Sequence, residues 1–106
     1  MSEVVVIAVI RAKPGVEEEL ASLFQELIPQ VQAEEGCLLY ALHRSLADPS
    51  EWLMVERWAS REALGEHERR PALRAFGERA GGLLEGAPAV SVYEACPAGS
   101  SEKGRI

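Results

Sequence analysis

The stretch that most constrains the fold is residues 3–12, which read EVVVIAVIRA. Most of these residues are β-branched, as is typical of a strand, and the run is apolar at both odd and even positions. Successive side chains of a strand point to opposite faces, so a sheet that contains this strand must be covered on both sides. The chain must therefore supply helices for one face and a different cover for the other.

A first helix is predicted after the KPG sequence at residues 13–15. Acidic residues at 17–19 favour the positive first turn of such a helix. Apolar residues recur at helical spacing, at Val16, Leu20, Leu23, Phe24, Leu27 and Val31. Pro29 lacks a backbone N–H, so we expect the helix to kink or to end early near Ile28.

Three further strands are predicted. They cover residues 37–45, 52–59 and 89–96. Turn-forming residues at 47–51 indicate that the second and third strands form an antiparallel hairpin.

Two helical pieces are predicted between the third and fourth strands. Ser60 is suited to cap a helix over residues 61–70, and Pro71 is suited to begin a second helical piece. That piece ends at Gly81 and Gly82. The resulting order is βαββαβ, which predicts an α+β, ferredoxin-like fold with an antiparallel four-stranded sheet and its helices on one face.

The other face of the sheet remains apolar. Val5, Ile7 and Val9 share the parity that no helix covers. A second copy of the chain is the simplest partner that could cover this apolar row. We therefore expect a homodimer packed sheet to sheet.

Length and composition indicate one domain. A chain of 106 residues with 47% hydrophobic residues is sufficient for a single core. We expect residues 1–97 to form this domain. Residues 98–106 lack periodic apolar residues, so a disordered tail is predicted there.

The charge and the N-terminal sequence disfavour two classes of partner. The net charge of -6 repels phosphate backbones, and the cluster of Arg69, Arg70 and Arg74 is too small to offset it, so no nucleic-acid partner is expected. The N-terminal stretch has no basic region or cleavage site, and its apolar run is shorter than a span of about 20 residues. We expect a cytoplasmic protein without a membrane partner.

No metal or organic cofactor is predicted. Cys37 and Cys96 lie far apart and match neither a metal-ligand spacing nor a disulfide framework, so we expect both to be reduced. The two histidines are isolated, and no glycine-rich phosphate-binding motif is present.

His67 is the first candidate for chemistry. It lies three residues after Leu64 and four after Ala63, so it shares their inward stripe on the predicted helix. An imidazole in this place could take a proton from a phenol or an enol near neutral pH. The alternative is a histidine at the edge of the core that bonds a backbone carbonyl.

Two residues of the third strand and one of the second are candidates for ligand binding. Glu56 and Trp58 share one strand face, where a buried carboxylate requires a partner such as Arg or His. Glu56 could orient the imidazole or bind a hydroxyl, with Trp58 as an aromatic wall, or the two could be an ion-pair member and a core residue. Tyr40 could offer its phenol to a ligand or be a half-buried strand tyrosine.

The segment EEGCLLYALHRSLADPSEWLMVERWASREALGEH, followed by RRPALRAF, resembles the antibiotic biosynthesis monooxygenase family, in particular its quinol monooxygenase-like members. The first strand with KPG, the Gly36–Cys37 pair and Tyr40 also fit, so the resemblance covers about residues 3–95. It implies a dimeric α/β barrel with a pocket between sheet and helices. It also implies oxidation of a small quinol or phenol-like aromatic by O2 without a metal or flavin.

On this pattern Glu56, Trp58 and His67 match residue by residue. The resemblance therefore implies His67 as the catalytic residue, with Tyr40, Glu56 and Trp58 binding the substrate. Similar proteins often have a second histidine where this chain has Ala72.

One other function remains open, and a second is disfavoured. The same fold could serve as a non-catalytic small-molecule-binding or stress-response dimer. Haem degradation, known in a branch of the fold, relies on an asparagine and a later histidine. This chain has no asparagine, and residues 73–80 contain no histidine.

Overall fold

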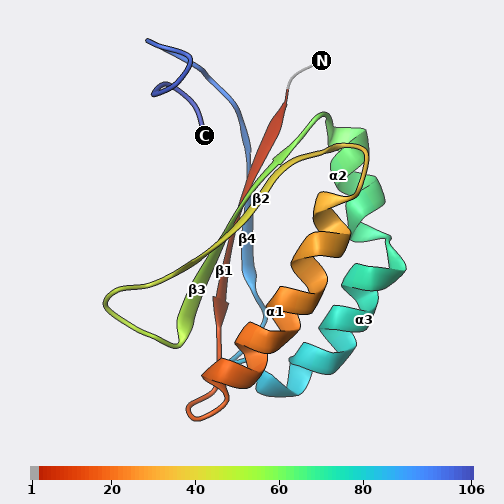
Figure 1. Cartoon of the computed structure of the whole chain (residues 1–106), viewed down its shortest axis with the longest axis vertical. Helices are drawn as coiled ribbons and strands as arrows, with labels where there is room; N and C mark the ends of the chain where they lie inside the picture. The colour runs from red at the N-terminus through yellow and green to blue at the C-terminus, as the bar shows by residue number, and fades with distance from the viewer. Residues whose placement is uncertain (1–2) are drawn as a thin grey trace.

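A computed structural model describes residues 3–106. Its elements are β1 (Val4–Arg11), α1 (Glu17–Gln32), β2 (Cys37–Arg44), β3 (Glu51–Trp58), α2 (Arg61–Glu68), α3 (Pro71–Ala80), the 3-10 helix η1 (Gly81–Leu83) and β4 (Ala89–Glu94). The strands form one antiparallel sheet in the order β2-β3-β1-β4, and the helices lie on one face of it (Figure 1). The predicted α+β, ferredoxin-like fold is confirmed.

The register of the sheet places alternate residues beneath the helices. Val6 of β1 pairs with Glu56 of β3, and Glu56 pairs with Tyr40 of β2. The even residues of β1 are buried and the odd residues from Val5 to Val9 are partly exposed, as their alternation predicts. Tyr40 and Glu56 are therefore neighbours on the helix-covered face.

Helix α1 does not end early at Pro29. It continues to Gln32, so of the two outcomes expected near Ile28, a kink or an early end, the early end is wrong. Both Pro29 and Gln25, whose carbonyl loses its donor, lie on the exposed side of the helix, where water can hydrate that carbonyl. Val31, which follows, is fully buried and holds the last turn against the core.

The two later helices begin as predicted. The hydroxyl of Ser60 accepts a hydrogen bond from the N–H of Ala63 at 3.1 Å, which caps α2. Pro71 occupies the first turn of α3. A short 3-10 helix at Gly81–Leu83 then leads toward β4.

The face of the sheet opposite the helices is apolar and partly exposed. Val5, Ile7 and Val9 point to this side, and Tyr93 of β4 lies beside Val5 and is exposed. The homodimer that would cover these residues remains a prediction.

The C-terminal segment has no helix or strand. Residues 97–106 contain a turn in which the N–H of Gly104 donates to the carbonyl of Ser100 at 2.8 Å. Within residues 3–106, no helix has the length and apolarity needed to cross a membrane.

Candidate active site

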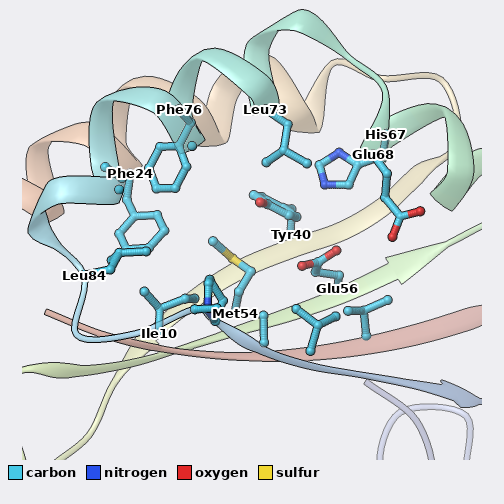
Figure 2. A pocket seen from close by; sticks show the side chains of 18 of the residues that line it. Ile10, Phe24, Tyr40, Met54, Glu56, His67, Glu68, Leu73, Phe76 and Leu84 are labelled. Atoms are coloured by element: carbon cyan, nitrogen blue, oxygen red, sulfur yellow. The ribbon is translucent and has the colours of Figure 1, made fainter.

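A cavity of about 530 Å³ lies between the sheet and the helices. Its floor is the helix-covered face of β1, β2 and β3, and α2 and α3 form the opposite wall (Figure 2). The side chains that line it include Ile10, Phe24, Tyr40, Met54, Glu56, His67, Glu68, Leu73, Phe76 and Leu84. A volume of this size is within the range of small-molecule sites, which is about 300–1,000 Å³.

The structure brings three of the four predicted site residues to this cavity. Tyr40, Glu56 and His67 line it, and Figure 2 shows Glu56 and His67 at the same end. Trp58 is not among the lining residues, and its side chain is fully buried. This burial agrees with the alternative of a core residue, and a direct contact between Trp58 and a substrate stays a prediction.

Trp58 instead supports two residues of the cavity. Its ring lies 4.4 Å from the His67 ring, centroid to centroid, at an interplanar angle of 30°. Its Nε1–H donates a hydrogen bond to Oε1 of Glu56 at 2.9 Å. The partner that Glu56 requires is thus an indole N–H, and the expected arginine or histidine partner is absent from its described hydrogen bonds.

The partner of His67 is Glu34, which sequence reasoning missed. Nδ1 of His67 lies 3.2 Å from Oε2 of Glu34, and the two side chains are only 5% and 8% exposed. Glu56 therefore does not orient the imidazole, and the alternative of a backbone carbonyl partner is also wrong. The two residues are 33 positions apart, so no local spacing links them.

The turn after α1 places Glu34. Its N–H donates to the carbonyl of Val31, and its own carbonyl accepts from the N–H of Cys37, both at 3.0 Å. The short EEG sequence ahead of β2 is the only local signal that an acidic residue lies at this turn.

The Glu34–His67 pair selects one form of the imidazole. An ionised carboxylate only accepts hydrogen bonds, so Nδ1 carries the proton that it donates to Glu34. In the neutral ring Nε2 then keeps its lone pair and can accept a proton from a ligand. This is the arrangement by which a carboxylate orients a histidine base.

Burial shifts the acidities of two further groups in the cavity. It raises the pKa of Glu56 from 4.5 to about 7, helped by the charges of Glu68 and Glu34 and opposed by the hydrogen bond from Trp58. Burial, followed by the charges of Glu56 and Glu34, also raises the pKa of Tyr40. Near neutral pH, Tyr40 is therefore a neutral hydrogen-bond donor and Glu56 exchanges a proton readily.

The described part of the chain has no cluster of side chains suited to a metal ion. In residues 3–106, no group of three or more His, Cys, Asp or Glu side chains is arranged to hold a metal ion. Cys37 is partly buried, Cys96 is exposed, and neither forms a disulfide. The expected absence of any cofactor remains a prediction.

Comparison with known proteins shows the family to which the chain belongs. The model of the family described as antibiotic biosynthesis monooxygenase matches residues 3–79. The chain belongs to this family. The match spans the sheet strands β1 to β3 and all residues of the Glu34–His67 and Glu56–Trp58 pairs.

Several curated relatives match most of the chain. Rv0793 of Mycobacterium tuberculosis, provisionally named a monooxygenase, is 37% identical over 91 residues, which are 86% of this chain and 89% of that protein. "Probable quinol monooxygenase YgiN" of Escherichia coli K12 is 36% identical over 92 residues, with 76% and 88% covered. The chain spans 62% of a longer Synechocystis protein, to which it is 30% identical.

Solved structures agree with this assignment. The structure of Rv0793 has a TM-score of 0.83 at 33% identity and covers 94% of this chain and 99% of its own. A provisionally assigned antibiotic biosynthesis monooxygenase of Caulobacter crescentus has a TM-score of 0.86 at 29% identity, with 90% and 91% covered.

Proposed function

We propose that the protein is a monooxygenase that oxidises a small quinol or phenol-like aromatic with O2 and needs no metal or organic cofactor. The observation that supports this proposal best is the buried Glu34–His67 pair at the wall of the cavity. The name of YgiN assigns that relative to quinol oxidation. We propose the same class of substrate for this chain.

In the first step His67 acts as the base. A phenol hydroxyl at the polar end of the cavity gives its proton to Nε2, and the ionised carboxylate of Glu34 stabilises the imidazolium that forms. Trp58 stacks on the ring and restricts its orientation. The product of this step is an electron-rich phenolate held in an apolar cavity.

In the second step the phenolate reduces O2. In a phenol whose para carbon carries hydrogen, this carbon forms a bond to one oxygen atom of O2, and the resulting peroxide takes the proton from His67. In a quinol, whose para carbon carries a hydroxyl group, a free ortho carbon takes its place. Loss of the hydrogen on that carbon, with cleavage of the O–O bond, leaves a second carbonyl group. The other oxygen atom leaves as water, so one phenol and one O2 give one quinone and one water.

Tyr40 and Glu56 bind the reacting oxygen atoms in this scheme. Both line the cavity beside His67. Tyr40, whose pKa is raised by burial, offers a neutral hydroxyl, and Glu56, with a pKa of about 7, can donate or accept a proton near neutrality. Trp58 remains a positioning residue for Glu56 and His67.

The second candidate is a small-molecule-binding protein without turnover. The same cavity would serve it, because shape and lining alone do not require a reaction. Oxygen consumption separates the two candidates.

The test uses 1-naphthol, which has a free para carbon, in an oxygen electrode. We expect consumption of one O2 per 1,4-naphthoquinone formed. His67→Gln should lower the rate about 100-fold, because loss of general-base catalysis typically costs 10²–10⁴-fold. His43→Gln, on an exposed position of β2, is the control and should keep the rate. No oxygen uptake by the native protein with a series of phenols and quinols would favour the binding protein.

A further inference from the structure

The polar end of the cavity carries negative charge without a matching cation. Glu56 and Glu68 both line this end, and Figure 2 shows their carboxyl groups on the same side of the space below His67. Of the residues that the structure describes at the cavity wall, none is lysine or arginine. Apart from His67, whose imidazole is charged only after it has taken a proton, no described lining residue can compensate a ligand that already carries a negative charge.

Arg70, which lies just after α2, pairs with Glu34 and not with the carboxylates that line the cavity. Nε of Arg70 lies 4.0 Å from Oε1 of Glu34, on the carboxylate that holds His67. Arg70 does not line the cavity. Its positive charge pairs with the carboxylate of Glu34. The carboxyl groups of Glu56 and Glu68 have no cationic partner among the described ion pairs.

The rest of the cavity is apolar. Phe24, Phe76, Ile10 and Leu84 lie at the end away from Glu56 and His67 (Figure 2). The rings of Phe24 and Phe76 are 5.1 Å apart, centroid to centroid. This end can hold the hydrocarbon part of a ligand, whereas burial there of a second polar group would lose hydration without a partner.

We infer that the cavity takes an uncharged aromatic alcohol and rejects its carboxylated counterpart, with Glu68 as a residue that sets this discrimination. The inference rests on the proposed function for the choice of an aromatic alcohol. Its charge selectivity rests on the distribution of carboxylates, and Glu68 is the exposed member of the pair.

The size of the effect follows from like-charge repulsion. Two like charges a few ångströms apart near a protein surface repel each other enough to weaken binding by about tenfold or more. Glu68 is exposed and partly screened by salt, so we place its contribution at the lower end, about tenfold.

The test compares two probes of nearly equal size in the absence of oxygen. The neutral probe is (1-hydroxynaphthalen-2-yl)acetamide and the anionic probe is (1-hydroxynaphthalen-2-yl)acetate, in which a methylene spacer leaves the naphthol hydroxyl protonated at pH 8. Their dissociation constants are measured by calorimetry at pH 8 and low salt with the native protein, Glu68→Gln and Glu66→Gln. Glu66 is the matched control, because it lies on the same helix, carries the same charge and does not line the cavity.

We expect the native protein to bind the amide at least about tenfold more tightly than the carboxylate. Glu68→Gln should reduce this ratio by about tenfold, mainly by improving carboxylate binding, and Glu66→Gln should leave it unchanged. Equal affinity for the two probes, tighter binding of the carboxylate, or binding of neither would overturn the inference. An equal effect of Glu66→Gln would also overturn the role of Glu68.

The outcome is independent of turnover. A protein that discriminates between the probes but consumes no oxygen would refute the proposed reaction and leave the charge selectivity standing. A protein that oxidises naphthols yet binds both probes equally would refute only the selectivity.

Discussion

At the scale of single residues, the site depends on pairs of side chains. His67 is oriented by Glu34, and Glu56 is held by Trp58. Strand alternation and helix spacing predict that Glu56 and His67 face inward, and both are buried. Neither pattern predicts Glu34, because its contact with His67 joins a turn after α1 to a different helix.

The first prediction concerns Glu34 as a positioning residue. Glu34→Gln keeps an oxygen that can accept from Nδ1 but removes the charge that stabilises the imidazolium, so we expect kcat for naphthol oxidation to fall at least about tenfold with KM nearly unchanged. Glu35→Gln, at an exposed neighbouring position, is the control. A rise in KM at constant kcat would instead make Glu34 a ligand-binding residue.

The second prediction concerns the stability cost of ionising Glu56. Its pKa rises from 4.5 to about 7 on folding, so its stabilising contribution is complete below pH 4.5 and is lost as the pH rises to about 7. This loss corresponds to about 3 kcal/mol at 1.36 kcal/mol per pH unit. Glu56→Gln cannot ionise and keeps an oxygen for the indole N–H of Trp58.

Urea unfolding at pH 5 and pH 8 tests this prediction. The unfolding free energy of Glu56→Gln, relative to the native protein, should rise by about 2–3 kcal/mol between the two pH values, because part of the loss has already occurred at pH 5. The exposed Glu66→Gln serves as the reference. Parallel pH profiles for the native protein and Glu56→Gln would show that the carboxyl of Glu56 is not perturbed by burial.

At the scale of elements, local signals predict most of the boundaries. Ser60 and Pro71 begin their helices as expected, because capping and the missing N–H of proline act locally. The end of α1 is the exception, because the local preference of Pro29 does not decide it. The buried stripe that includes Val31 keeps α1 helical beyond it, and tertiary packing outweighs the local preference.

The third prediction concerns the contact between α2 and the entry to β2. A Cβ placed on Gly36 would overlap the Cβ of Ala63, so Gly36→Ala should lower the unfolding free energy by about 1–3 kcal/mol. Ala63→Gly removes the obstacle and itself costs about 1 kcal/mol in a helix. The double variant should therefore be more stable than the sum of the two single changes predicts.

Gly77→Ala is the control for this experiment. A Cβ at Gly77 meets nothing within 4 Å, and alanine favours the helix. Denaturant unfolding of the native protein, the two single variants and the double variant gives the coupling energy. Strict additivity of Gly36→Ala and Ala63→Gly would show that the two positions are not in steric contact.

At the scale of the whole molecule, the sheet has one covered and one uncovered face. The uncovered face follows directly from the apolar run of β1, so the need for a cover is visible in the sequence. The depth of the cavity and the full burial of Trp58 cannot be predicted from the sequence. Strand alternation shows on which side of the sheet a residue lies, but it does not show how far that residue is from solvent.

The fourth prediction is a homodimer that buries Val5, Ile7 and Val9. A lone subunit leaves this row partly exposed, so light scattering at micromolar concentration should give twice the mass of the chain. Ile7→Lys should shift the equilibrium to monomer, whereas Lys13→Glu, on an exposed loop, should not. A native protein that scatters as a stable monomer would contradict the expected assembly.

The proposed reaction is tested most directly by tracing the oxygen atoms of O2. 1-Naphthol is incubated with the native protein under ¹⁸O2, and the quinone is reduced at once to limit exchange with water before mass spectrometry. We expect one heavy oxygen atom in each product molecule, no accumulation of hydrogen peroxide, and loss of the labelled product with His67→Gln. An unlabelled quinone formed together with hydrogen peroxide would contradict it, and so would the absence of any product.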